Sequence, residues 1–125
     1  MREILFRGQA FGSREWVCGH YRNGRKIHII YHDENSDNCY AVRPETIGQF
    51  TGLTDKNGNK IFEGDILDCK SGLYERCEVI FNEFCSAFQL MCADGFSDFF
   101  LCSINHKEME IIGNIHDNPE LLEKP

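Results

Sequence analysis

The strongest constraint on the fold of this 125-residue chain is a set of three X-Gly dipeptides that separate short apolar segments. They are Asn23-Gly24, Asn57-Gly58 and Asp94-Gly95. Asn-Gly and Asp-Gly accept the positive φ angles of a tight hairpin turn, so each dipeptide predicts two antiparallel strands joined by a short loop. A chain interrupted in this way is expected to form an antiparallel β fold.

The composition of the chain also favours strands over helices. Ile, Val, Thr and the aromatic residues together number 33, whereas Ala, Leu and Met number 15. β-branched and aromatic side chains pack well on a pleated sheet and lose rotamer freedom in a helix. Together with the turns, this bias predicts a mainly β protein with a barrel or sandwich architecture.

Alternation of apolar and polar residues places the remaining strands. We expect them at residues 3–11, 66–70, 78–81, 87–93, 96–102 and 109–115. Two short helical turns are expected, one opening at Pro44 and one near the C-terminus, where a capping residue precedes Pro119. The polar residues 33–38 are expected to form a loop.

The hairpin at Asn23-Gly24 allows the strand pairing to be worked out. A two-residue loop places His20 opposite Ile27 and Trp16 opposite Tyr31. Alternation then gathers on one face Trp16, Cys18, Ile27, Ile29 and Tyr31. Because this face is the more apolar of the two, it is expected to be buried.

The net charge of −7 is distributed unevenly along the chain. Residues 1–48 hold seven cations and six acids, whereas residues 49–125 hold six cations and fourteen acids. Affinity for nucleic acid comes largely from cations on phosphates, so the overall balance argues against binding through the whole surface. A local site in the N-terminal part is still compatible with this balance, because cations lie beside aromatic rings there: Arg14, Arg22, Arg25, Lys26, Trp16 and Tyr21.

No recognisable catalytic or metal-binding motif occurs in the sequence. The seven cysteines are an odd number and contain no Cys-x-x-Cys, the pair that structural zinc sites usually use: Cys18, Cys39, Cys69, Cys77, Cys85, Cys92 and Cys102. Most of them lie on expected strands beside apolar residues, so buried, reduced thiols are expected. Glycine-rich phosphate loops and His-Glu-x-x-His are also missing. We therefore expect no cofactor, no metal ion and no enzymatic activity.

Glu63 and Asp65 flank Gly64, and two carboxylates this close together can perform acid–base chemistry when burial separates their pKa values. Asp in a turn more often accepts hydrogen bonds from nearby backbone N–H groups. The turn role is the interpretation that we favour.

Membrane insertion and secretion are not indicated. No apolar run approaches the roughly 18–20 residues that span a bilayer. The first residues are charged and lack the apolar core of a signal peptide. The sequence therefore predicts a cytoplasmic protein that does not bind membranes.

Three blocks of the sequence resemble the YopX family of phage and prophage proteins. They are residues 2–7 (REILFR), 49–66 (QFTGLTDKNGNKIFEGDI) and 111–122 (IIGNIHDNPELL), and they follow the order of the family. The resemblance covers nearly the whole chain, with residues 49–66 the most specific block. The cysteine-rich stretch 69–102 falls outside it.

The resemblance implies a small, often self-associating β protein of the bacterial host cytoplasm, with no catalytic residues to carry over. It implies an N-terminal hairpin lobe at residues 1–48, an SH3-like barrel at 49–118 and a short helical turn within the tail 119–125. Within the matched blocks, residues with a structural role are Thr51, Gly52, Leu53, Asp55, Asn57, Gly58, Glu63, Gly64, Asp65, Gly113, Asn114, Asn118 and Pro119.

These observations lead to a functional hypothesis, a non-enzymatic protein-binding or oligomeric assembly module that contacts another copy or a host or phage protein. A small core cannot bury all 15 aromatic residues, and those expected in contacts include Tyr74, Phe84, Phe96, Phe99 and Phe100. Phe99 and Phe100 are adjacent on a strand, so they must point to opposite faces. Candidate interaction residues are Trp16, Tyr21, Arg22, Arg25, Phe99 and Phe100. The alternative hypothesis is a nucleic-acid-binding module that acts in phage replication or regulation.

Overall fold

The computed structural model describes residues 3–24, 27–31, 39–69, 76–92, 98–103, 105 and 108–123. Its regular elements are antiparallel strands, and each helical element that it describes is a 3-10 turn of three or four residues. The expectation of a mainly β fold is therefore confirmed. Several features that the sequence singles out lie outside the described residues: Arg25, Lys26, Tyr74, Asp94-Gly95, Phe96 and the loop 33–38.

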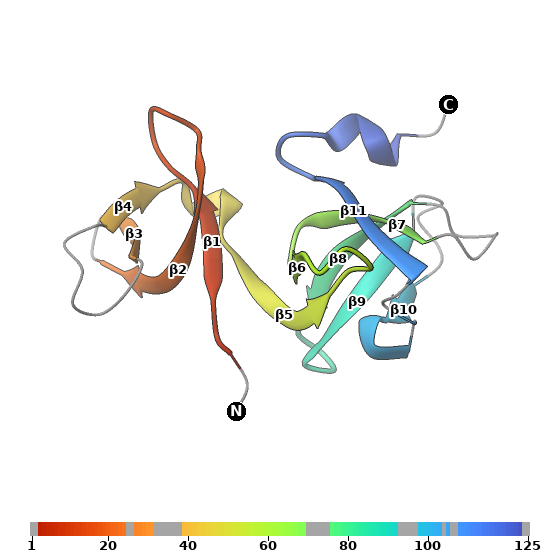
Figure 1. Cartoon of the computed structure of the whole chain (residues 1–125). Helices are drawn as coiled ribbons and strands as arrows, with labels where there is room; N and C mark the ends of the chain where they lie inside the picture. Colours follow the sequence, from red (N-terminus) through yellow and green to blue (C-terminus); the bar gives the residue numbers. More distant parts are fainter. Residues whose placement is uncertain are drawn as a thin grey trace. The chain divides into compact units, whose positions relative to one another are not determined.

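The chain divides into two compact units, Met1–Gly52 and Leu53–Pro125. The N-terminal unit contains β1 (Phe6–Gln9), β2 (Trp16–Asn23), β3 (His28–Tyr31), β4 (Cys39–Val42), the turn η1 (Pro44–Thr46) and the first part of β5 (Gly48–Thr54). Its strands pair in the order β4-β3-β2-β1-β5 (Figure 1). A bridge between Ala10 and Val42 joins β4 to the chain just after β1, so this small sheet curls back on itself.

The core of the N-terminal unit consists of small β-branched side chains. Val17, Ile30 and Val42 are buried, and Phe6, Tyr21 and Ile47 pack against them. Gly8 lies directly over this core: an added Cβ would stand 3.0 Å from the Val42 Cβ. A side chain at this position would therefore push the strands apart.

The hairpin register and the buried face predicted at Asn23-Gly24 are both wrong. His20 pairs with Tyr31 and Asn23 with His28, because the connection is longer and closes with a 2.9 Å hydrogen bond from the N–H of Gly24 to the Ile27 carbonyl. In the observed register the same residues still share a face of the hairpin, but the face predicted to be buried is the outer one. Cys18 and Ile27 are exposed, whereas the opposite face carries the buried residues. Val17 and Ile30 lie in the interior with the rings of Phe6 and Tyr21, and Trp16 lies on the outside.

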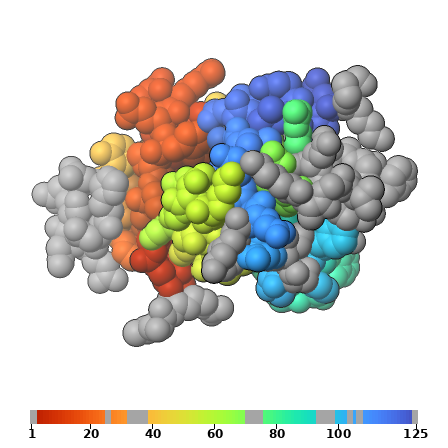
Figure 2. Space-filling model, turned by 45° about the vertical axis from the view of Figure 1, so that its right-hand side comes forward, coloured from red at the N-terminus to blue at the C-terminus, as the bar shows by residue number. Residues whose placement is uncertain are grey.

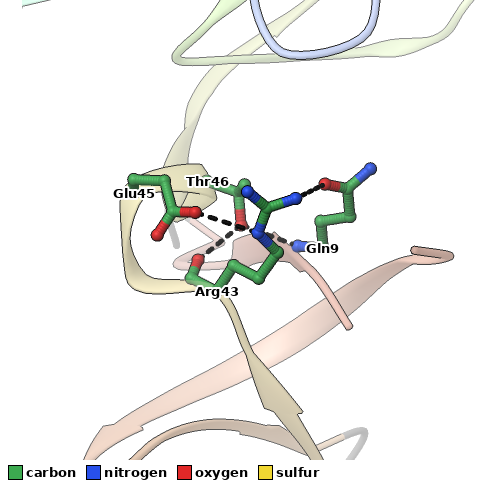
Figure 3. Close-up of polar contacts among 4 residues, drawn as sticks. All are labelled: Gln9, Arg43, Glu45 and Thr46. Carbon is green, nitrogen blue, oxygen red and sulfur yellow. Dashed lines mark hydrogen bonds and ion pairs between the residues drawn. The ribbon is translucent and has the colours of Figure 1, made fainter. Parts of the chain in front are cut away.

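A buried polar network anchors the turn η1 to β1 (Figure 3). The backbone N–H of Gln9 donates to Thr46 Oγ1 over 2.9 Å, and the Thr46 hydroxyl donates to the Arg43 carbonyl over 2.6 Å. Arg43 also donates to Glu45 over 2.9 Å and to the Gln9 side chain over 3.4 Å. The network satisfies the backbone groups that the turn would otherwise leave unpaired in the interior.

The C-terminal unit is a second antiparallel sheet with a larger core. It contains the end of β5, β6 (Lys60–Phe62), β7 (Asp65–Cys69), β8 (Arg76–Asn82), β9 (Ala87–Cys92), β10 (Asp98–Phe100), the turn η2 (Leu101–Ser103), β11 (Met109–Asn114) and the turn η4 (Pro119–Leu122). The end of β5 pairs with β6, as the Asn57-Gly58 signal predicts, and the other strands follow the order β10-β9-β8-β7-β11. The buried core residues are Ile61, Leu67, Cys69, Cys77, Val79, Leu90, Cys92, Leu101 and Met109.

The prediction of a closed SH3-like barrel needs correction. Within the described residues, β10 and β11 form the two ends of an open five-stranded order rather than a closed ladder. β10 has only three residues and passes directly into η2, which buries Leu101 in the core instead of extending the pairing. Both helical turns expected from Pro44 and Pro119 form, as 3-10 turns.

Candidate interaction surfaces

The turn between β5 and β6 is organised by the buried carboxylate of Asp55. Its Oδ1 accepts the backbone N–H groups of Asn57 (3.0 Å) and Asn59 (2.9 Å), and its Oδ2 accepts that of Ile111 on β11 (3.0 Å). Burial alone would raise the pKa of this carboxyl, but these three donors outweigh burial and hold it below its usual value. Asp55 thus ties two distant parts of the chain together.

The same turn reaches the surface beside β11 (Figure 2). Residues 56–60 are exposed, and Gly58 adopts a φ of 82°. Lys56 reinforces the contact with β11, because its N–H donates to the Met109 carbonyl and its ammonium group lies 3.3 Å from the Glu110 carboxylate. Three residues just before this turn belong to the same sequence block, residues 49–66. Leu53 packs on the core, Thr51 is half-buried, and Gly52 is exposed with a φ of 91°.

The second half of the sequence block 49–66 includes β6 and the turn that leads into β7. Gly64 has a φ of 93°, and its N–H donates to the Val79 carbonyl. Asp65 is buried and accepts the N–H of Phe62 over 2.7 Å, so this carboxylate takes a turn role. Burial raises the pKa of the Glu78 carboxyl, and the Glu63 carboxylate adds to that shift.

The C-terminal block closes with a compact turn after β11. Asn118 Oδ1 accepts the N–H of Asn114, and Asn114 Oδ1 accepts those of His116 and Asp117. A Cβ added at Gly113 would lie 2.6 Å from Asn118 Oδ1, so a side chain here would displace the Asn118 amide from its contact with Asn114. The matched residues therefore make contacts that hold turns and strands together.

The cysteines divide into two groups, which corrects the expectation that they are generally buried. Cys69, Cys77 and Cys92 lie in the core of the C-terminal unit, whereas four thiols are exposed: Cys18, Cys39, Cys85 and Cys102. Cys77 and Cys92 face each other on β8 and β9, with their sulfur atoms 3.2 Å apart. A hydrogen bond with Cys69, together with burial, raises the pKa of the Cys77 thiol, which therefore stays protonated.

One candidate surface surrounds the turn between β8 and β9, and we call it the hairpin tip, formed by Phe81, Phe84 and Phe88. Phe84 is fully exposed and Phe81 is 40% exposed. The rings of Phe81 and Phe88 meet edge to face, with their centroids 5.1 Å apart. The hairpin tip thus presents aromatic surface that the chain does not cover.

The adjacent residues Phe99 and Phe100 on β10 behave as strand alternation requires. Phe99 pairs with Leu90 and packs against the core of the C-terminal unit, whereas Phe100 is 47% exposed. Of these two phenylalanines, Phe100 is therefore the one available to a partner.

A different surface lies on the outside of the N-terminal sheet, and we call it the outer face. Alternation along β1, β2 and β3 places on it Arg7, Trp16, Cys18, His20, Arg22 and Tyr31. The Arg7 guanidinium lies 4.9 Å from the Trp16 ring centroid. The rings of His20 and Tyr31 lie 5.7 Å apart on paired strands.

Sequence reasoning found only part of the outer face. Trp16 and Arg22 were candidates and lie on it, whereas Tyr21 points inward, where it hydrogen-bonds His28 Nδ1 and packs on Phe6. Arg7, His20 and Tyr31 are not among the predicted interaction residues, although strand alternation already groups Tyr31 with Trp16. These residues can be identified from the two-residue alternation of side chains along each strand, carried from Trp16 to the paired strands. This also requires knowing that the opposite face forms the core. Arg14 lies in the turn before β2 and is exposed.

Neither a metal-ligand cluster nor a membrane-spanning helix occurs among the described residues. No group of three or more His, Cys, Asp or Glu side chains there is arranged to hold a metal ion. The described part of the chain likewise has no helix with the length and apolar character needed to cross a membrane.

Comparison with known proteins identifies the relatives of this fold. A family model described as YopX protein matches residues 10–123. No curated protein matches the chain. Among solved structures, the chain is similar to the crystal structure of protein EF1440 from Enterococcus faecalis, with 27% sequence identity and a TM-score of 0.58 over 98% of this chain and 100% of that one. Since the family model spans nearly the whole sequence, the chain belongs to the YopX family.

Proposed function

We propose that this chain is a non-enzymatic assembly module, encoded by a phage or prophage and active in the host cytoplasm, whose partner is a second copy of itself. The observation that carries the proposal is the full exposure of Phe84 at the hairpin tip, next to the partly exposed Phe81. Self-association is also what resemblance to the YopX family implies. The buried carboxylates of Asp55 and Asp65 are engaged by backbone donors, which favours a binding role over a catalytic one.

The exposed aromatic area is large enough to matter for association. A Phe side chain offers roughly 200 Å², so Phe81 and Phe84 expose about 290 Å² per copy. Two copies that meet tip to tip would cover about 570 Å², roughly a third of a standard interface of about 1,600 Å². The contact is self-complementary, as a twofold axis requires.

Electrostatics sets the expected salt response. Glu83 lies beside Phe84 at the hairpin tip and is exposed, and residues 49–125 hold an excess of eight acids over cations. Like charges therefore oppose the contact between two copies, while burial of Phe84 favours it. Added salt should screen the repulsion and strengthen association.

The test is the mass of the full-length chain by light scattering at micromolar concentrations. We expect twice the 14.5 kDa of one chain for the wild type, and a return to 14.5 kDa for Phe84→Ser. Phe11→Ser is the matched control, because Phe11 is 58% exposed but lies in the N-terminal unit; it should leave the mass unchanged. A monomeric wild type, or a Phe84→Ser variant that keeps the dimer mass, would overturn the proposal.

A further inference from the structure

The outer face of the N-terminal sheet differs from the rest of the chain in its charge. Its cations are Arg7 and Arg22; Arg22 is exposed, whereas the Nε and Nη2 atoms of Arg7 are buried. The remaining described positions of this face on β1 to β4 are uncharged: the buried Gln9, and Ile29, Cys39 and Ala41. The outer face thus carries no carboxylate among its described positions, although the chain as a whole has 20 acidic residues.

The outer face also offers ring surfaces next to these cations. Trp16 is half-buried, and Arg7 lies against its ring at 4.9 Å, which helps to fix the ring on the sheet. The half-buried His20 and Tyr31 form a second ring pair. Trp16 and His20 are four residues apart on β2, about 13 Å at 3.3 Å per residue, a distance that an extended nucleic-acid strand spans within a few nucleotides.

We infer that the outer face binds single-stranded nucleic acid, with bases stacked on Trp16 and on the His20–Tyr31 pair and phosphates held by Arg22. Cations that follow the backbone and aromatic rings that stack on bases are the two components of sequence-tolerant single-strand binding. The exposed Arg22 suits an anionic partner, and the rings beside it offer faces on which unpaired bases stack. The inference is independent of the proposed self-association, since the two surfaces lie in different units.

A single strand is favoured over a duplex for a geometric reason. Duplex recognition usually inserts a helix or a two-stranded ribbon into a groove. The ring surfaces of Trp16 and Tyr31 instead lie on a sheet, where only unpaired bases can present their faces to them.

The chain supplies its own reporter for the test, because Trp16 is its only tryptophan. Full-length protein is titrated at low salt with an oligo(dT) of about 12 nucleotides, within the site size of small β folds. We expect saturable quenching of Trp16 fluorescence. The slope of log affinity against log salt should fall by about 0.7 in Arg22→Ala, since each phosphate contact on a single strand contributes about that much. Tyr31→Ser should weaken binding about tenfold or more through lost stacking.

Three controls keep the result decisive. Arg14→Ala removes one positive charge, as Arg22→Ala does, but from a turn of the same unit, and it should retain the wild-type affinity. Circular dichroism verifies that each variant is folded. Phe84→Ser should bind the oligonucleotide like the wild type, so failure of the self-association proposal does not affect this result. The inference is overturned if oligo(dT) leaves Trp16 fluorescence unchanged, if a duplex of equal length binds more tightly, or if Arg14→Ala weakens binding as much as Arg22→Ala.

Discussion

Replacing Asp55 by Asn tests the claim that one buried carboxylate holds the C-terminal unit together. The shape is unchanged, but the amide offers one acceptor oxygen where the carboxylate offers two. One oxygen can still accept from Asn57 and Asn59, while the new NH2 group faces the N–H of Ile111, donor against donor. Losing one charge-assisted hydrogen bond and weakening two others should lower the free energy of unfolding by about 3 kcal/mol at neutral pH.

The effect of Asp55→Asn should depend on pH in a defined direction. The folded-state pKa of Asp55 lies below its ordinary value of 3.8. A depressed folded pKa means that the carboxylate stabilises the fold fully above the unfolded pKa and loses this effect as pH falls through the folded pKa. The difference between wild type and variant should therefore be constant near neutral pH and shrink below about pH 4.

Chemical unfolding followed by far-UV circular dichroism at several pH values measures both effects. Asp117→Asn is the matched control in the same unit, because Asp117 is exposed, and it should change the unfolding free energy by less than about 0.5 kcal/mol. An Asp55→Asn variant within about 1 kcal/mol of wild type at neutral pH would refute the role of the three backbone donors. A gap that persists undiminished in acid would refute the ionic part of the argument.

Other expectations follow from the same contacts. Thr46→Val removes a buried hydroxyl together with both of its hydrogen bonds and orphans the Gln9 N–H, so unfolding followed by Trp16 fluorescence should show a loss of about 2 kcal/mol; an unchanged midpoint would contradict this. Gly64→Ala forces a side chain into a φ of 93° and should cost about 1–2 kcal/mol in a thermal melt, whereas equal melting temperatures would show that the turn relaxes. Four thiols should react with a thiol reagent in the native protein and seven after denaturation; seven fast thiols would show that the core sulfurs are accessible.

The class of fold was predictable because it rests on local preferences. Strands at residues 65–69, 87–92 and 109–114 fall within a residue of the expected segments, since alternation and β-branched residues act over short distances. The open order of the C-terminal sheet was not predictable in this way. It depends on whether the chain after Phe100 continues to pair or turns Leu101 into the core, and this is decided by contacts far apart in sequence.

The candidate surface shows where sequence reasoning reaches its limit. Alternation correctly grouped Trp16, Cys18 and Tyr31 on one side of the hairpin, but it cannot say which side faces the interior. Hydrophobicity favoured the side with the larger apolar residues. The structure buries Val17 and Ile30 instead, with the rings of Phe6 and Tyr21 packed against them.

The net charge of the chain also bears on how the outer face would behave. The net charge of −7 makes the chain as a whole repel an anionic strand, over a Debye length that grows to about 30 Å at 0.01 M salt. Contact with Arg22 favours binding at low salt, whereas this long-range repulsion opposes it under the same conditions. The salt dependence of affinity should therefore flatten as salt is lowered and steepen once the repulsion is screened. A strictly linear dependence down to the lowest salt would mean that the net negative charge of the chain exerts no influence on the bound strand.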